Sequence, residues 1–166
     1  MSAITLQRRD FTRALATVAP VIRKKSTIPV LGAALLTRDG DRLRISGTDL
    51  DVQIDATVPA AMNGHDLSAT LAMPARIGRA IRITGAETVA IEPGEKLGIT
   101  AGDLRLSLDG LPAGGWPRLE AEPKDVFSAT LTPEAIAALR RVSPAISTEE
   151  TRYYLNGIHV HRGEGP

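Results

Sequence analysis

The residues best suited to chemistry in this sequence are three aspartates and two histidines. Asp49, Asp51 and Asp55 lie close together and could bind a divalent cation, as in a metal-dependent nuclease. On a β-hairpin, however, Asp49 would occupy the turn, while Asp51 and Asp55 would share a solvent-exposed face. His159 and His161 alternate along an expected strand, but two imidazoles without a third ligand form an incomplete zinc site. Neither group predicts a metal centre.

Nucleophilic and nucleotide-binding patterns are also missing from the sequence. No Gly-x-Ser-x-Gly segment, phosphate-binding loop or dinucleotide fingerprint occurs in it. The chain contains no cysteine, which excludes thiol catalysis, disulfides and cysteine-based zinc sites. We therefore expect a protein that is not an enzyme and that uses no cofactor.

Basic residues concentrate in the segments expected to be helical. Residues 1–25 hold six basic residues and one acid, whereas residues 73–83 hold three basic residues and no acid. The helix expected at 133–146 carries Arg140 and Arg141 against Glu134. Since the formal net charge of the whole chain is only +1, the expected strands and loops must carry a negative balance.

The arginines of the second helix have a spacing that suits phosphate contacts. Arg76, Arg79 and Arg82 fall on one face of a helix, broadly opposite Ile77 and Ile81. Arginines without interleaved acids are better placed to face a polyanion than to face water. No aromatic residue lies among them and no base-reading helix signature occurs, so we expect non-specific contacts with the phosphate backbone of a duplex.

These helices belong to a duplicated unit. Residues 41–55 and 95–109 share a pattern in which apolar and polar residues alternate on both sides of a Gly/Asp turn. Such alternation predicts a β-hairpin with one buried and one solvated face. A helical apolar stripe precedes each copy, namely Phe11, Ala14, Leu15 and Val18 in the first and Ile77, Ala80 and Ile81 in the second. The predicted fold class is α+β, with two β-α-β-β-β half-units whose helices cover one face of antiparallel sheets.

A second, longer repeat indicates the start of another domain. The residues Leu15, Val18, Pro20, Ile22, Thr27 and Leu31 recur, in order, as Leu139, Val142, Pro144, Ile146, Thr151 and Leu155. Pro20 and Pro144 should each end a helix, since proline lacks the amide donor. Thr132 and Pro133 suit the N-cap and first position of the later helix.

The domain organisation follows from the repeats and from the Pro/Gly-rich segment between them. We expect a first domain at 1–122 that includes an interdomain linker at 109–124, where Trp116 covers an apolar patch. Residues 125–166 then supply an incomplete start of a second domain: a strand, a helix and a strand. On this interpretation the chain is a truncated form of a larger protein.

The bulk composition is that of an ordinary globular protein. Hydrophobic residues make up 43% and charged residues 23% of the chain. The longest apolar stretch, 29–36, is too short to cross a bilayer, and the first residues lack the apolar core of a signal peptide. We expect a cytoplasmic protein with no membrane association.

Several segments resemble the β subunit of bacterial DNA polymerase III, the sliding clamp family. Thr27–Gly32 is similar to that family's Thr-Leu-Pro-Ile-Leu-Gly segment, and Gly47–Leu50 matches its Gly-Thr-Asp-Leu turn. Leu111–Ala113 with Trp116 and Pro117 resembles the linker between its domains. Arg152–Gly157, Arg-Tyr-Tyr-Leu-Asn-Gly, matches a hallmark of the family. The resemblance extends over essentially the whole chain.

The resemblance implies a processivity factor of chromosomal DNA replication. Members are head-to-tail homodimers of three-domain subunits that close around duplex DNA and tether polymerase III, with helices lining the hole. The residues that would face DNA by this resemblance and by the charge pattern are Arg13, Arg23, Lys24, Lys25, Arg76, Arg79, Arg82, Arg140 and Arg141.

The resemblance also implies two protein contacts. Tyr154 and Leu155 match part of a cleft that binds peptides of the DNA polymerase III alpha subunit, the clamp loader and repair proteins; its other walls come from segments that this sequence lacks. Ring closure would involve Ile77, Ile81, Arg105 and Leu106 on the first-domain side, against a third domain that is also missing. Two alternatives stay open: a standalone DNA-binding remnant that does not encircle DNA, and a metal nuclease built on the aspartates.

Overall fold

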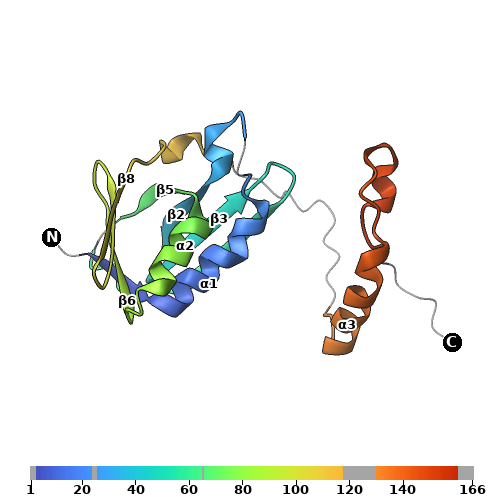
Figure 1. Cartoon of the computed structure of the whole chain (residues 1–166), viewed down its shortest axis with the longest axis horizontal. Coiled ribbons are helices and arrows are strands. Elements are labelled where there is room, and N and C mark those ends of the chain that lie inside the picture. Colours follow the sequence, from blue (N-terminus) through green and yellow to red (C-terminus); the bar gives the residue numbers. More distant parts are fainter. Residues whose placement is uncertain (1–2, 24–25, 65, 118–129, 161–166) are drawn as a thin grey trace. The chain divides into compact units, whose positions relative to one another are not determined.

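One order of elements occurs twice in the first part of the chain (Figure 1). The first copy comprises β1 (Ile4–Gln7), α1 (Arg8–Val18), β2 (Ala33–Asp39), β3 (Arg42–Thr48) and β4 (Gln53–Pro59). The second copy comprises β5 (Ser68–Ala72), α2 (Pro74–Ile83), β6 (Thr88–Glu92), β7 (Leu97–Ala101) and β8 (Leu104–Leu108). The predicted α+β class and its duplicated β-α-β-β-β half-units are confirmed.

The structure is a computed structural model that describes residues 3–23, 26–64, 66–117 and 130–160. The chain divides into two compact units, Met1–Ala121 and Glu122–Pro166. Short 3₁₀ helices connect the larger elements; they are η1 (Ala19–Val21), η2 (Pro29–Gly32), η3 (Ala113–Gly115), η4 (Ser143–Ala145) and η5 (Glu150–Leu155).

The two half-units of the first unit interlock by exchanging their first strands. One antiparallel sheet has the order β1-β6-β7-β8, and the other has the order β4-β3-β2-β5. Thus β1 of the first copy pairs with β6 of the second, with Ile4 opposite Ile91, and β5 pairs with β2, with Leu71 opposite Ala34. Because each sheet contains strands from both copies, neither half-unit forms its sheet alone.

Helices α1 and α2 pack against each other on one side of the strands (Figure 1). The apolar stripe predicted for α1 is buried throughout, and the helix ends at Val18, two residues before Pro20. In α2, Pro74 takes the first helical position, where its missing amide costs nothing, and Ile77 and Ile81 face the core. The apolar spacing thus sets which side of each helix meets the sheets.

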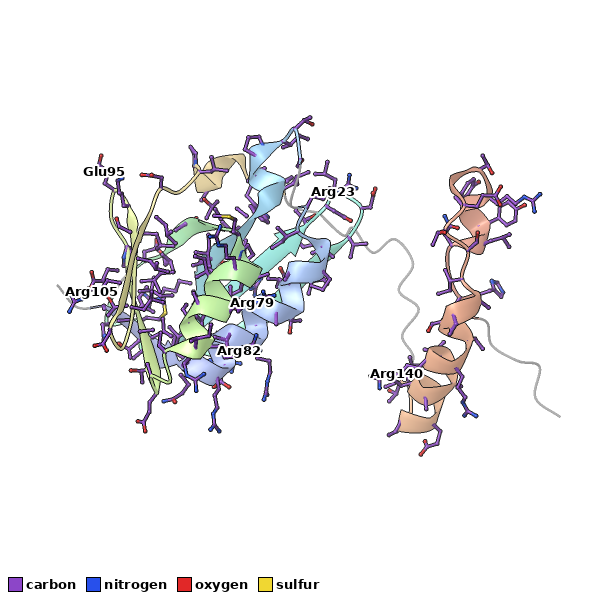
Figure 2. The ribbon with its side chains drawn as sticks, viewed as in Figure 1. Arg23, Arg79, Arg82, Glu95, Arg105 and Arg140 are labelled. Atoms are coloured by element: carbon purple, nitrogen blue, oxygen red, sulfur yellow. The ribbon has the colours of Figure 1, made fainter. Side chains whose placement is uncertain are left out.

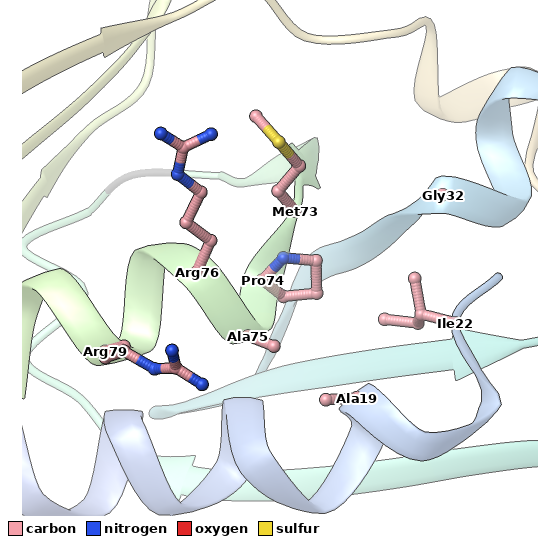
Figure 3. A pocket seen from close by; sticks show the side chains of 8 residues that line it. All are labelled: Ala19, Ile22, Gly32, Met73, Pro74, Ala75, Arg76 and Arg79. Atoms are coloured by element: carbon pink, nitrogen blue, oxygen red, sulfur yellow. The ribbon is translucent and has the colours of Figure 1, made fainter. Parts of the chain in front are cut away.

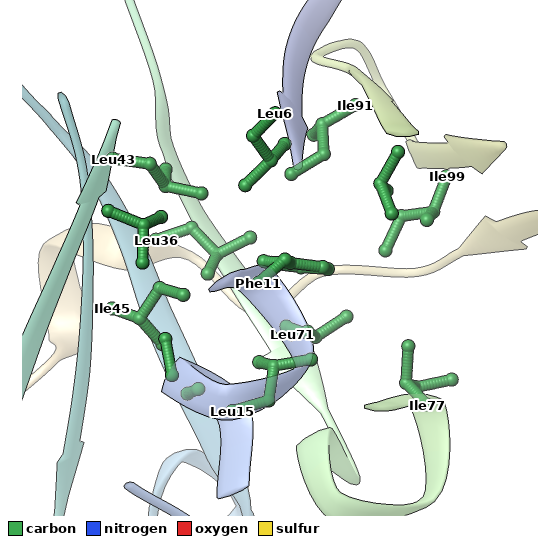
Figure 4. Close-up of a cluster of buried hydrophobic side chains, with 14 of the residues drawn as sticks. Leu6, Phe11, Leu15, Leu36, Leu43, Ile45, Leu71, Ile77, Ile91 and Ile99 are labelled. Carbon is green, nitrogen blue, oxygen red and sulfur yellow. The ribbon is translucent and has the colours of Figure 1, made fainter. Parts of the chain in front are cut away.

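A single large core fills the space between the helices and both sheets (Figure 4). Phe11 of α1 lies among aliphatic side chains from the two sheets, including Leu36, Leu71 and Ile91, and all four are fully buried. Truncating a buried Phe to Ala typically costs about 3–5 kcal/mol. This core fixes the position of both helices and therefore the direction in which their outer faces point.

The two predicted hairpins form, but they differ in register. In the first, Thr48 pairs with Gln53 across a four-residue turn; in the second, Ala101 pairs with Leu104 across a two-residue turn. Leu50 therefore lies in a turn with a positive φ of 85°, whereas its repeat counterpart Leu104 begins β8. Leu50 and Leu104 hold the same place in the repeated pattern of 41–55 and 95–109, but their structural positions differ because the two turns differ in length.

Residues 109–117 lead away from β8 along the β2–β5 side of the unit. Trp116 is buried against Ala33 and Leu35 of β2 in a small separate cluster. This agrees with the expectation that Trp116 covers an apolar patch. The indole nitrogen Nε1 has no hydrogen-bond partner among the described residues.

The second unit is described for residues 130–160 and contains α3 (Pro133–Val142). The predicted cap is confirmed, since Thr132 Oγ1 accepts a hydrogen bond from the amide of Ala135 at 3.3 Å. No strand occurs among residues 130–160, so the strand expected around His159 is wrong for the described part. A strand needs a hydrogen-bonding neighbour, and none of these residues provides one.

Candidate nucleic-acid interface

Three arginines cover the outer face of α2. Arg76, Arg79 and Arg82 are exposed, while Ile77 and Ile81 on the opposite face are buried. Within the described residues, no acid lies within ion-pair distance of these guanidinium groups, and the first turn of α2 contains no acid. Figure 2 shows Arg79 and Arg82 on the side of α2 that lies next to α1. The expected arrangement of one apolar and one cationic face is therefore present.

The neighbouring helix α1 also carries exposed cationic groups. Arg13 is exposed, and Arg9 lies one turn earlier on the same helix face, also exposed. Arg9 belongs to the basic N-terminal segment but not to the predicted DNA-facing set, although its spacing of four residues from Arg13 indicates a shared helix face. The one acid of α1, Asp10, is half-buried.

Arg8 has a different role, which the sequence did not reveal. Its side chain donates hydrogen bonds to the carbonyl oxygens of Ala86 and, at 3.4 Å, of Arg82. Its amide also donates to the carbonyl of Glu87 at 2.9 Å. Arg8 thus ties the start of α1 to the end of α2, and it supports the cationic face without belonging to it.

The basic segment after α1 is only partly described. Arg23 is exposed, and its amide donates to the carbonyl of Leu31 at 3.0 Å, which holds it beside η2. Lys24 and Lys25, also predicted to face DNA, lie outside the described residues.

The segments that contain the later strands and their connecting loops have the opposite charge balance. Residues 33–72 and 86–117 contain eleven acids and five Lys or Arg residues. Two ion pairs are described there: Arg44 contacts Asp39 at 2.7 Å, and Lys96 contacts Asp109 at 2.9 Å. The hydrogen bond and charge of Asp39 raise the pKa of Arg44. These ion-paired cations contrast with the arginines of α2, which have no acidic partner among the described residues.

In the second unit, Arg140 and Arg141 are exposed near the end of α3, where cations favourably oppose the helix dipole. At the other end of α3, hydrogen bonds with the backbone amide of Glu134 itself and with the Thr132 hydroxyl lower the pKa of the Glu134 carboxyl group.

Tyr154 and Leu155, the residues predicted to line part of a peptide cleft, lie in η5 and are 70% and 44% exposed. The Tyr154 ring makes an edge-on contact with Tyr153, with ring centroids 5.9 Å apart.

The predicted ring-interface residues need a correction. Ile77 and Ile81 are only 7% and 0% exposed, because they pack into the core of their own unit. Their side chains cannot contact another subunit in this conformation, so their assignment to an interface is wrong. Arg105 is exposed and Leu106 is half-buried on β8, which lies at the edge of its sheet; their role stays a prediction.

The aspartates considered for metal binding are used locally. Asp49 Oδ1 accepts hydrogen bonds from the amides of Val52 at 2.9 Å and Asp51 at 3.1 Å. These bonds, that of Val52 first, lower the pKa of Asp49. Asp55 accepts from the side-chain amide of Gln53 at 3.1 Å. In the described part of the chain, no three acidic or histidine side chains are grouped as metal ligands; His161 lies outside that part.

Comparisons with known proteins identify the family. The family described as "DNA polymerase III beta subunit, N-terminal domain" matches residues 2–120. This chain belongs to the DNA polymerase III beta subunit family. Proteins named "Beta sliding clamp" from Caulobacter vibrioides and Pseudomonas aeruginosa are 36% and 32% identical to it over 95% and 93% of its length.

Solved beta subunit structures show the same fold. The "Caulobacter crescentus pol III beta" structure matches 98% of this chain with a TM-score of 0.85 and 35% identity. The structure of the DNA polymerase III subunit beta from Pseudomonas aeruginosa matches 92% with a TM-score of 0.75 and 33% identity. This beta-family chain spans 43% of the Caulobacter protein and 42% of the Pseudomonas protein. None of its described helices has the length and apolar character needed to cross a bilayer.

Proposed function

We propose that this chain acts in DNA replication as the DNA-facing part of a sliding clamp, contacting duplex phosphates without reading sequence. The observation that carries the proposal is the arginine face of α2 beside α1, which has no acidic partner among the described residues and is set against strand-and-loop segments in which acids outnumber cations. Phosphate contacts give affinity without base specificity, which suits a protein that must move along DNA. Arg13, Arg23, Arg76, Arg79 and Arg82 would make these contacts in the first unit.

Encirclement and partner binding belong to the same proposal. Tyr154 and Leu155 would form part of a cleft for apolar peptides of the polymerase III alpha subunit and the clamp loader, and their exposure leaves them accessible. Arg105 and Leu106 on the edge strand β8 would contribute to a ring contact between subunits. Residues 1–122 would then form a first clamp domain, with 125–166 belonging to the next, and Arg140 and Arg141 would extend the cationic surface.

The salt dependence of DNA binding tests the assignment of the arginine face. For the full chain, the logarithm of the association constant for a duplex should fall linearly with the logarithm of salt concentration, by about 0.9 per phosphate contact. The double variant Arg76→Gln/Arg79→Gln should reduce that slope by about two such contacts. The control Arg42→Gln/Lys96→Gln removes the same charge from the sheets and should leave the α2 contribution intact.

A second comparison separates a ring from a weak, non-encircling binder. A ring stays on closed circular DNA at high salt and leaves linear DNA through its ends, whereas a surface binder leaves both at the same rate. If the salt dependence of DNA binding were unchanged in Arg76→Gln/Arg79→Gln, the arginine face of α2 would not be the DNA interface. Equal loss from circles and linear DNA would instead support the non-encircling alternative.

A further inference from the structure

A pocket of about 380 Å³ opens where the end of α1 meets the start of α2 (Figure 3). Its walls come from three places in the sequence: the segment after α1, the end of η2 and the first turn of α2. Ligand pockets in proteins commonly span about 300–1,000 Å³. The size therefore admits one or two large side chains of a partner, and not a large cofactor.

The walls are mostly apolar. Ala19 and Ile22 line one side, and Met73 and Pro74 line the other, as Figure 3 shows. Met73 is 53% exposed, although methionine is a residue that cores readily accommodate. Its unbranched thioether chain can adapt to differently shaped apolar partners. Ile22 and Pro74 are themselves buried, so the apolar surface that this unit leaves uncovered comes mainly from Met73.

Met73 also has an unusual backbone conformation. Its φ and ψ are 50° and 51°, in the left-handed region, and its side chain makes no capping hydrogen bond to α2. Left-handed conformations cost a non-glycine residue about 1–2 kcal/mol, and residues held in such conformations cluster at ligand-binding positions. Here the conformation places a long apolar side chain at the mouth of the pocket.

The rim of the pocket is cationic. Arg76 and Arg79 both line it, with side chains that extend to opposite sides of α2 in Figure 3, and the lining residues include no acid. The start of α2 adds the positive end of its helix dipole, with no acidic residue in the first turn. The pocket therefore combines an apolar floor with positive charge at its rim.

We propose that this pocket binds a peptide segment in which one or two leucine-like side chains stand next to carboxylates. The apolar side chains would enter between Ile22 and Met73, while the carboxylates would pair with Arg76 and Arg79. A nucleic acid could satisfy the arginines, but it has no aliphatic side chain to fill the apolar part. A long lipid tail would exceed the pocket.

One consequence links this pocket to the DNA-facing surface, and it alone rests on the proposed function. A peptide that pairs with Arg76 and Arg79 withdraws both from phosphate contact. Bound peptide and duplex DNA should therefore compete, so that an acidic partner segment would loosen the hold on DNA.

The methyl group of Met73 can report peptide binding in the pocket by NMR, because Met73 lines it. The full chain has three methionines, of which Met73 lines the pocket and Met62 is buried in the core. With carbon-13 methyl-labelled methionine, the probe peptide acetyl-Glu-Glu-Leu-Leu-Glu-amide should shift the Met73 methyl signal and leave that of Met62 in place. A probe with serine in place of both leucines should bind at least about tenfold more weakly, since each buried leucine contributes that much or more.

Variants separate the pocket from the DNA surface. Ala75→Trp places an indole in the pocket from an exposed position; it should weaken the probe at least about tenfold while duplex affinity changes less than about twofold. Arg79→Gln should weaken both ligands. The proposal is overturned if Met73 does not respond at about 1 mM probe, if the serine probe binds equally well, or if only duplex DNA shifts Met73. Failure of duplex binding with an intact Met73 response would count against the DNA-facing surface and leave the pocket proposal standing.

Discussion

The side-chain hydroxyl of Thr70 makes two hydrogen bonds to the backbone of Leu111. Thr70 Oγ1 donates to the Leu111 carbonyl at 2.9 Å and accepts from the Leu111 amide at 2.6 Å. Thr70 is buried in β5, an edge strand. The segment that leaves β8 is therefore held against the other sheet by one side chain, close to where Trp116 packs on β2.

Replacing Thr70 with valine keeps the shape of the side chain and removes both hydrogen bonds. Because the Leu111 amide and carbonyl then lose their partner, we expect the free energy of unfolding to fall by about 1–3 kcal/mol. Urea unfolding followed by the emission of Trp116, the single tryptophan, measures this. Thr70→Ser keeps the hydroxyl and should lose less. A valine variant as stable as the native chain would show that these bonds contribute nothing.

Gly47 in β3 lies where the chain passes the end of α1. A Cβ added there would be 2.9 Å from the Val18 carbonyl oxygen and 3.2 Å from Ile22 Cγ1, so Gly47→Ala should destabilise the unit by about 1–3 kcal/mol. Gly78→Ala is the matched control, because its Cβ would lie 3.4 Å from Leu15 and the helix gains up to about 1 kcal/mol. In thermal unfolding, Gly47→Ala should lower the melting temperature, whereas Gly78→Ala should raise it or leave it unchanged.

Much of the fold could be predicted because periodicity reports burial directly. The stripe from Phe11 to Val18 is buried as expected, whereas the alternation in the first hairpin is confirmed only in part, since Leu43 and Ile45 are buried but Leu50 and Val52 are exposed. The exchange of β1 and β5 between the sheets could not be predicted, since strand partners far apart in sequence leave no periodic signal. The difference in turn length between the two hairpins could not be predicted either, because it depends on local details. The longer first turn is held by the hydrogen bonds of Asp49, and the shorter second turn uses Gly102 with its φ of 57°.

The candidate site was predictable in part for the same reason. Opposite faces of α2 carry Arg76 and Ile77, so the exposed position of the arginines follows from helical spacing. The resemblance to a family placed Ile77 and Ile81 at an interface, although the same spacing already indicated that their side chains face the core. Arg8 was missed because its bonds to Ala86 and Arg82 require the packing of α1 against α2, which no local pattern encodes.

The carboxylate of Asp49 should titrate below the ordinary aspartate pKa of about 3.9. Its hydrogen bonds from the amides of Val52 and Asp51 favour the charged form. With a lowered pKa in the folded state, its contribution to stability is complete above the ordinary value and is lost as pH falls through the folded value. Carboxyl NMR titration measures the pKa. In Asp49→Asn this part of the acid dependence should vanish, whereas Asp51→Asn, the control, should retain it.

The conformation of Met73 predicts a conflict between stability and binding. Asparagine tolerates the left-handed region better than methionine or alanine does, so Met73→Asn should be more stable than Met73→Ala by about 0.5–1 kcal/mol. Both changes remove the thioether side chain, and little burial is lost because Met73 is 53% exposed.

Chemical denaturation and probe-peptide titration of the same two variants check this together. Both should bind the leucine-containing probe more weakly than the native chain, whatever their stability, since the apolar wall beside Pro74 is gone. If Met73→Asn were more stable and bound the probe as well as the native chain, Met73 would have no part in the pocket. If it were no more stable than Met73→Ala, the left-handed backbone would carry no strain. Weaker binding in a more stable variant would mean that methionine is retained there for its side chain, against the preference of the backbone.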